Sequence, residues 1–276
     1  MTLNKSEKKN YSSSNIKEKE PTEEYLKISK EQLSNTLETP IDHDKQLLIL
    51  DLNGTLVSRT GKTGLYVRPY DEYFFDYIFS HFYVIVWSSA QPHNVAKMCK
   101  IFGKYETKLQ LIWTRKNFDL TEEEYNSKTI TIKDLRKIWQ HLPQFNATNT
   151  ILLDDSPKKT ILQPFNHVII SEFNHLDQSF RKKEGDSSGG ENELIYIKDY
   201  LDKLKYQDNV ANYIFQYPYQ SSLNKDNNNN DTLLSKYPKS TLCRHFVFYG
   251  NGVTRRPTIR NLSVEELTFA FDKIKL

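Results

Sequence analysis

Two short apolar runs, each closed by carboxylates, constrain the fold of this chain more than any other feature. Leu47 to Leu50 is an unbroken apolar run that ends at Asp51, and Ile151 to Leu153 is a second run that ends at Asp154 and Asp155. Such runs, without polar alternation, are typical of strands buried on both faces of a parallel sheet. Ligands bind beyond the carboxyl ends of these strands. We therefore expect the three carboxylates to meet in one pocket, and carboxylate oxygens are the ligands that Mg²⁺ prefers.

The segments between these runs alternate between helical and β-like patterns. A helix is expected at 71–78, because Phe74, Tyr77 and Ile78 share one face, and a β-branched strand at 83–86 follows and ends near Ser88. Similar patterns predict a helix at 94–102, a strand at 168–170 and a helix at 194–204. Alternating strands and helices indicate an α/β fold, with a mostly parallel sheet covered on both faces.

Residues 106–132 interrupt this alternation. They contain short β-like pieces at 109–113 and 129–132, joined by a polar linker with a capping-box pattern at Thr121 and Glu124. We interpret this segment as a β-rich interruption of the alternating pattern.

Both ends of the chain differ from the middle in composition. Residues 1–40 are polar and charged, with apolar side chains spaced loosely enough for a short helix, and they are expected to form a mostly disordered tail. Residues 207–276 are expected to form a C-terminal extension with an Asn-rich loop at 225–231 and a terminal helix that starts at Ser263.

Composition narrows the classes of partner and compartment. The excess of 38 Lys and Arg over 35 Asp and Glu gives a net charge of only +3, so no nucleic-acid binding is expected. The most apolar stretch, 74–87, contains Asp76 and His81 and is too short to cross a bilayer. Cys99 and Cys243 lack a metal-type spacing, which favours a reducing compartment, nuclear or cytoplasmic. The first 40 residues lack Arg and contain many Glu, which argues against mitochondrial import but leaves it open.

Five motifs then follow one another in a recognisable order. They are Asp51-Leu52-Asn53-Gly54-Thr55, Val67-Arg68-Pro69, Trp87-Ser88-Ser89, Lys133-Asp134-Leu135 and Leu153-Asp154-Asp155-Ser156-Pro157. Over residues 45–206 this pattern resembles the FCP1-homology domain (NLI-interacting factor, small CTD phosphatase-like) of the haloacid dehalogenase superfamily. The resemblance implies a haloacid dehalogenase-like three-layer α/β sandwich, in which the segment 106–132 is a small β-rich insertion.

The resemblance also implies a reaction and a metal. Asp51 holds the place of the nucleophile that forms an aspartyl-phosphate, a covalent intermediate that divides one difficult displacement into two steps. The side chains of Asp51 and Asp155 and the backbone carbonyl of Asn53 are then the expected Mg²⁺ ligands, and Asp154 is expected to support the metal indirectly or through water. The phosphoryl group is expected to contact Ser88, Lys133 and Asn53, and Lys133 also balances the negative charge of the cluster.

One position departs from the family pattern. Family phosphatases carry a second Asp two residues after the nucleophile, which protonates the leaving oxygen and then activates water, whereas this chain has Asn53. An amide side chain acts neither as an acid nor as a base near neutral pH. Loss of general acid–base catalysis typically costs about 10² to 10⁴ in rate, and we expect the loss to be largest for alkoxide leaving groups such as serine.

Two kinds of function therefore remain open. The first is a weakened Mg²⁺-dependent phosphatase that acts on a phosphoserine or phosphothreonine protein or on another phosphomonoester. The second is a catalytically silent FCP1-like binding module, as in the Tim50-type subunits of mitochondrial import or another scaffold, with a protein partner bound through the C-terminal extension. A transferase or phosphoanhydride hydrolase is a minor third alternative.

Several basic residues also have two interpretations. Arg68 is as consistent with a structural hydrogen-bond donor as with a phosphate ligand, and Arg115 could lie at the pocket mouth or away from substrate. Lys133 would be a surface lysine if the motif alignment slips across 106–132. The C-terminal arginines fit a solvated face better than a surface for an acidic partner; they are Arg244, Arg255, Arg256 and Arg260.

Overall fold

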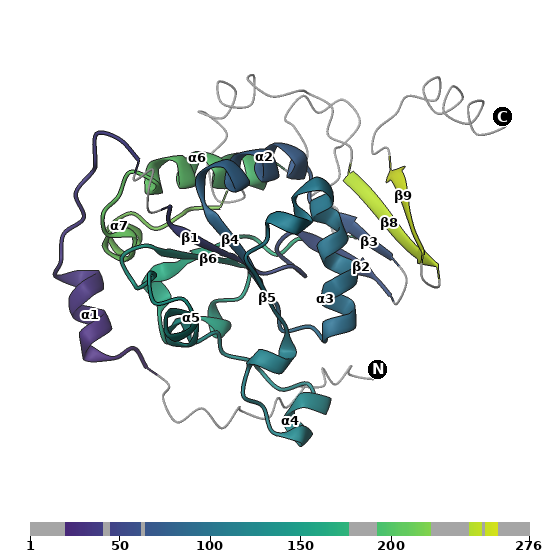
Figure 1. Cartoon of the computed structure of the whole chain (residues 1–276), viewed down its shortest axis with the longest axis horizontal. Coiled ribbons are helices and arrows are strands. Elements are labelled where there is room, and N and C mark those ends of the chain that lie inside the picture. Colours follow the sequence, from purple (N-terminus) through teal and green to yellow (C-terminus); the bar gives the residue numbers. More distant parts are fainter. Residues whose placement is uncertain are drawn as a thin grey trace, which may run out of the picture.

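The structure is a computed structural model that describes residues 20–40, 45–61, 64–176, 192–221, 243–249 and 252–258. Five of the described strands form a parallel sheet at the centre of the molecule, in the order β5-β4-β1-β6-β7 (Figure 1). Its strands are β1 (Leu47–Leu50), β4 (Tyr83–Trp87), β5 (Leu111–Trp113), β6 (Thr150–Asp154) and β7 (His167–Ile169). The two runs that end in carboxylates are thus adjacent central strands, with Leu50 paired to Leu153.

Helices cover both faces of this sheet because alternate residues of each strand point to opposite sides. On one side, Leu48 and Leu50 of β1 join a core cluster with side chains of α2 (Asp71–His81), α3 (Pro92–Cys99) and α6 (Glu193–Leu204). On the other side, Leu47 and Ile49 join a second cluster with Leu135 and Ile138 of α5 (Leu135–His141). The expected three-layer α/β sandwich is confirmed (Figure 1).

A second, antiparallel sheet has the strand order β2-β3-β8-β9. Its strands are β2 (Val57–Thr60), β3 (Gly64–Val67), β8 (Cys243–Tyr249) and β9 (Gly252–Thr258). Phe246 and Phe248 of β8 are buried in the same core cluster as Leu50, so part of the predicted C-terminal extension packs on the main domain. Arg244 forms an internal ion pair with the carboxylate of Asp71 and donates to the carbonyl of Ile101 at 2.9 Å. The side chains of Arg255 and Arg256 and the whole of Arg260 lie outside the described residues.

The segment 106–132 is not the β-rich insertion that the sequence suggested. Its strand β5 joins the edge of the central sheet, where Trp113 packs edge-on against Trp87 with ring centroids 5.1 Å apart. The described residues 129–132 form no strand, and Thr129 and Thr131 are buried individually. The other elements here are helical: the 3₁₀ helices η1 (Lys100–Lys108) and η2 (Arg115–Asn117), and α4 (Glu122–Asn126).

Part of the predicted N-terminal tail is folded. Residues 23–30 form α1 (Glu23–Lys30), which packs against α7 (Val210–Gln216) and the 3₁₀ helix η4 (Pro164–Asn166). The amide of Asn209 donates to the carbonyls of Ile28 and Gln32 at 2.9 and 2.8 Å. The short helix that the sequence allowed is therefore present at 23–30, and the described part of the predicted tail, 20–40, packs on the main domain. Residues 1–19, the Asn-rich loop at 225–231 and the helix expected from Ser263 lie outside the described residues.

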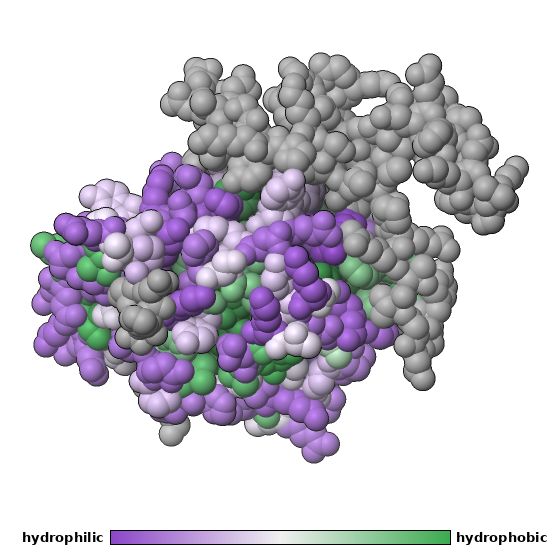
Figure 2. Space-filling view, turned by 45° about the horizontal axis from the view of Figure 1, so that its top comes forward, coloured by the Kyte–Doolittle hydropathy of each residue, from purple (hydrophilic) through white to green (hydrophobic). Residues whose placement is uncertain are grey.

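The described surface is mostly hydrophilic on the face that Figure 2 shows, with hydrophobic residues in small groups. None of the described helices has the length and apolar character needed to cross a membrane.

Candidate active site

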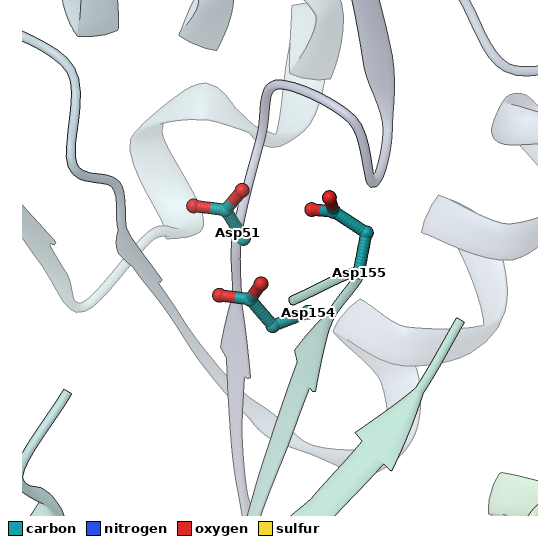
Figure 3. A group of neighbouring side chains, drawn as sticks. All are labelled: Asp51, Asp154 and Asp155. Carbon is teal, nitrogen blue, oxygen red and sulfur yellow. The ribbon is translucent and has the colours of Figure 1, made fainter. Parts of the chain in front are cut away.

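Three carboxylates meet at the carboxyl ends of β1 and β6. One oxygen each of Asp51, Asp154 and Asp155 lies within 4.8 Å of the others, and the three side chains face a common space (Figure 3). The sheet register sets this geometry, because the backbone N–H of Asp51 donates to the carbonyl of Leu153 at 2.9 Å. Asp51 and Asp154 are buried, whereas Asp155 is partly exposed.

Lys133 lies inside this cluster. Its Nζ is 3.0 Å from Oδ1 of Asp51 and 2.5 Å from Oδ2 of Asp154, and its side chain is fully buried just before α5. The alternative of a surface lysine is therefore wrong. Burial alone would raise the pKa of Asp154, but the ammonium groups of Lys133 and Lys159 outweigh this effect and lower the pKa to about 2.

Lys159 is a member of the cluster that sequence reasoning missed. It ends the 3₁₀ helix η3 (Pro157–Lys159), and its Nζ is 3.2 Å from Asp154 Oδ1, 3.5 Å from Asp51 Oδ2 and 4.0 Å from Asp155 Oδ1. Burial lowers the pKa of Lys159, but the three carboxylates more than compensate, so the pKa lies above its ordinary value and the group is charged. No local sequence signal pointed to it, because i,i+4 pairing is expected along a helix and Asp155 lies outside η3.

The loop after β1 closes tightly over Asp155. Gly54 has a φ of +92°, and a Cβ at this position would lie 2.8 Å from Asp155 Oδ2, so the close approach of this backbone requires glycine. The hydroxyl of Thr55 donates to Asp155 Oδ1 at 3.1 Å and accepts from the Asp155 N–H at 3.2 Å. Burial, together with the charges of Asp51 and Asp154, raises the pKa of Asp155 to about 6.

Asn53 and Ser88 complete the set of residues that the sequence singled out. Asn53 lies on the loop between Asp51 and Gly54, and its side chain is exposed. Ser88 follows β4 directly and is buried, at the same edge of the sheet as Asp51 because β4 pairs with β1. The Ser88 hydroxyl accepts from the N–H of Ala90 at 3.3 Å.

Arg68 and Arg115 hold backbone segments. The buried guanidinium of Arg68 donates to the carbonyl of Thr55 at 2.8 Å and to that of Ser171 at 2.7 Å. The guanidinium of Arg115 donates to three carbonyls of the segment 124–127 at 2.6 to 2.9 Å. Of the two interpretations of Arg68, the structure thus favours the structural donor, and it directs Arg115 toward α4.

The donor set fits a small hard cation. Mg²⁺ takes oxygen ligands, and oxygens of Asp51 and Asp155 converge in the cluster, while the backbone carbonyl of Asn53 stays the third ligand that the family resemblance implies. Asp154 is held by Lys133 and by the N–H of Ser156 at 2.8 Å, so it is oriented to support the neighbouring ligands.

Comparison with known proteins agrees with the motifs. The profile of the NLI interacting factor-like phosphatase family matches residues 46–212. An uncharacterized FCP1 homology domain-containing protein of Schizosaccharomyces pombe is 33% identical over 71% of this chain and 88% of its own length. The ubiquitin-like domain-containing CTD phosphatase of Arabidopsis thaliana is 26% identical over 67% of this chain, and the Drosophila melanogaster protein of that kind is 25% identical over 60%.

The match covers only about half of each CTD phosphatase, 54% and 51% of their lengths. A solved structure of Fcp1, an essential RNA polymerase II CTD phosphatase, aligns with a TM-score of 0.37 at 12% identity over 84% of this chain and 62% of that chain. The family profile spans more than half of this chain and includes every motif residue discussed above. The chain therefore belongs to the NLI interacting factor-like phosphatase family.

Proposed function

We propose that this chain is a Mg²⁺-dependent phosphatase that works through an aspartyl-phosphate on Asp51 and has a weakened acid–base step. The observation that carries this proposal is the position of Asp51, which is buried at the end of a central strand with its carboxylate held by Lys133 at 3.0 Å. A nucleophile needs a fixed orientation toward phosphorus, and a strand end braced by a buried ammonium provides it.

In the first step, an Asp51 carboxylate oxygen bonds to phosphorus while the bond from phosphorus to the leaving oxygen breaks. In the second step, water attacks the aspartyl-phosphate and releases inorganic phosphate and free Asp51. Lys133 keeps the carboxylate oriented through both steps, and the Ser88 hydroxyl is the proposed hydrogen-bond donor to a phosphoryl oxygen. Bound Mg²⁺ would supply positive charge against the transferring phosphoryl group.

Asn53 limits both steps. Its amide can donate a hydrogen bond to a phosphoryl oxygen, but it cannot give a proton to the leaving oxygen or take one from water. Leaving groups that are stable as anions, such as aryl oxides, depend least on the missing acid. By analogy with the named CTD phosphatases, the proposed natural substrate is a phosphoserine or phosphothreonine segment of a protein, and the proposed location is nuclear or cytoplasmic.

The amide of Asn53, in place of a group that can transfer a proton, also favours a second candidate, a catalytically silent module that binds a protein partner. In that case the carboxylates and Lys133 would serve only to hold the fold, and a phosphorylated ligand would bind without turnover.

The test is hydrolysis of an aryl phosphate by the purified full chain with Mg²⁺, compared with Asp51→Asn. Loss of a covalent nucleophile typically costs about 10⁴-fold or more, so the substitution should abolish measurable activity. Equal rates for the two proteins would exclude catalysis at Asp51 and leave the binding module.

A further inference from the structure

The ammonium of Lys159 lies among the same carboxylates that the proposed metal requires. Its Nζ contacts oxygens of Asp154, Asp51 and Asp155 at 3.2, 3.5 and 4.0 Å. Lys133 contacts the opposite oxygens of two of these groups, Oδ1 of Asp51 and Oδ2 of Asp154. The two lysines therefore contact different sides of the cluster. Lys133 contacts two of the carboxylates, and Lys159 contacts the side where all three converge.

The two ammonium groups differ in how firmly they are enclosed. The side chain of Lys133 is fully buried, whereas that of Lys159 is 17% exposed at the edge of the cluster. The backbone of Lys159 is held by a hydrogen bond, because its carbonyl accepts the N–H of Lys133 at 2.7 Å, whereas its ammonium is held by ion pairs with the carboxylates. The Lys159 side chain can therefore move toward solvent while the backbone of η3 stays in place.

Electrostatics explain why a cation sits there. Three carboxylates in a largely buried pocket repel one another, and the charge of Lys133 balances only part of this repulsion. A second ammonium on the open side offsets much of the rest. A divalent ion bound by the same oxygens would also offset this repulsion. The ammonium and the ion would then occupy the same place, so only one of them can bind these oxygens at a time.

We propose that Lys159 is an internal counter-cation that competes with Mg²⁺ for the carboxylates of Asp51 and Asp155, the expected metal ligands, while it also pairs with Asp154. In the metal-free protein its ammonium holds the cluster together, and it swings toward solvent when the ion binds. This chain would consequently bind Mg²⁺ more weakly than it would without Lys159. The inference rests on the metal site of the proposed function, and it concerns affinity for the ion rather than turnover.

The neighbouring residue offers a matched control. Lys158 belongs to the same turn and carries the same charge, but its side chain is exposed. Calorimetric titration of the full chain with MgCl₂ should give a dissociation constant about 10-fold lower for Lys159→Gln than for wild type, a typical size for coupling between two ligands of one site. Lys158→Gln should stay within about twofold, because an exposed charge is screened. In EDTA, where no metal replaces the lost ammonium, Lys159→Gln should have a lower melting temperature than Lys158→Gln.

A measurement on the wild-type chain removes any dependence on how the variants fold. Brief acetylation of lysines, quantified by mass spectrometry, should modify Lys159 several-fold faster with MgCl₂ than with EDTA, and Lys158 at the same rate in both. Equal or slower acetylation of Lys159 with saturating MgCl₂ would overturn the proposal, and so would an unchanged or higher dissociation constant for Lys159→Gln.

Failure of this inference is separable from failure of the proposed function. If Lys159→Gln binds Mg²⁺ no more tightly than wild type but Asp51→Asn abolishes the rate, only the competition is overturned. If none of the proteins binds Mg²⁺, the competition and the Mg²⁺ dependence of the proposed function are overturned together. If Lys159→Gln binds Mg²⁺ more tightly but Asp51→Asn does not change the rate, Lys159 competes at the metal site of a silent domain.

Discussion

The loops after β1 and β6 build the two halves of the candidate site, and they differ from each other in an instructive way. The β1 loop contributes Asp51 but carries the amide of Asn53 where the family resemblance places a carboxylic acid. The β6 loop contributes Asp154 and Asp155 and adds the ammonium of Lys159. The first difference acts on proton transfer and the second on metal binding, so the two loops are separable by experiment.

The two loops are also braced by different chemistry. The guanidinium of Arg68 holds the β1 loop through the carbonyl of Thr55 at 2.8 Å, and guanidinium groups do not lose their proton in proteins. The imidazole of His167 holds the β6 loop through the carbonyl of Asp154 at 2.8 Å. The contact that holds the β1 loop should therefore not weaken in mild acid, whereas the contact that holds the β6 loop should weaken.

The largest expected effect concerns the β1 loop alone. Asn53→Asp should restore a group that can transfer protons and raise kcat/KM for a phosphoserine peptide by about 10² to 10⁴. For an aryl phosphate the gain should be smaller, because its leaving group needs less protonation. Steady-state rates on both substrates check this, with the double variant Asp51→Asn, Asn53→Asp as the inactive control. No gain on either substrate would mean that Asn53 is not what limits turnover.

The second effect concerns the residue that joins the loops. Lys133→Met should reduce the free energy of unfolding by about 3 to 5 kcal/mol, because Asp51 and Asp154 would keep buried charges without the nearer and more deeply buried of their two shared lysines. Urea denaturation checks this. Lys100→Met is the control, since its pair with Glu106 is exposed and should contribute less than about 1 kcal/mol. Equal losses for the two variants would show that Lys133 does not hold the loops together.

The third effect concerns the point where the β1 loop touches the β6 loop. Gly54→Ala should cost about 2 to 3 kcal/mol in unfolding free energy, because it combines a φ of +92° with a Cβ 2.8 Å from the Asp155 carboxylate. Gly61→Ala separates the two causes, since Gly61 also has a positive φ, of +61°, but no atom lies within 4 Å of its Cβ position. Denaturant curves for both variants should show the larger loss at Gly54. Equal losses for Gly54→Ala and Gly61→Ala would mean that backbone strain alone, and not the contact with Asp155, destabilises the Gly54 variant.

The central sheet and the acidic pocket were predictable because they depend on local patterns. The runs 47–50 and 151–153 are short, apolar and closed by carboxylates, and the rule for parallel sheets places their ends together. The antiparallel sheet was not predictable in this way. β8 pairs with β3 across most of the chain, and no local pattern encodes which distant strand an apolar segment will join.

The lysines and arginines show a further limit. Lys159 follows Lys158 in a turn, a pattern typical of a surface, and only the fold brings its ammonium to three carboxylates. The sequence likewise left Arg68 open between two roles, because the choice depends on where the carbonyls of Thr55 and Ser171 lie in space. The assigned roles of Asp51, Asn53, Ser88 and Lys133 in catalysis stay predictions.

The smallest expected effect tests the difference in how the loops are braced. His167 is buried between the Thr160 hydroxyl and the Asp154 carbonyl; because a carbonyl only accepts, Nε2 carries the proton and Nδ1 accepts from Thr160. Burial lowers the pKa of His167 to about 4, below its unfolded value of about 6.5.

Between these two values the unfolded chain binds more protons, so stability is fully present above pH 6.5 and is lost as the pH falls toward 4. The expected loss from pH 7 to pH 5 is about 2 kcal/mol for wild type relative to His167→Gln, measured by urea denaturation at both values. The comparison with the variant is needed because Asp155, with its pKa raised to about 6, contributes the opposite slope in both proteins. Parallel pH profiles for the two proteins would mean that His167 does not make the β6 loop sensitive to acid, and the contrast with the Arg68-braced loop would disappear.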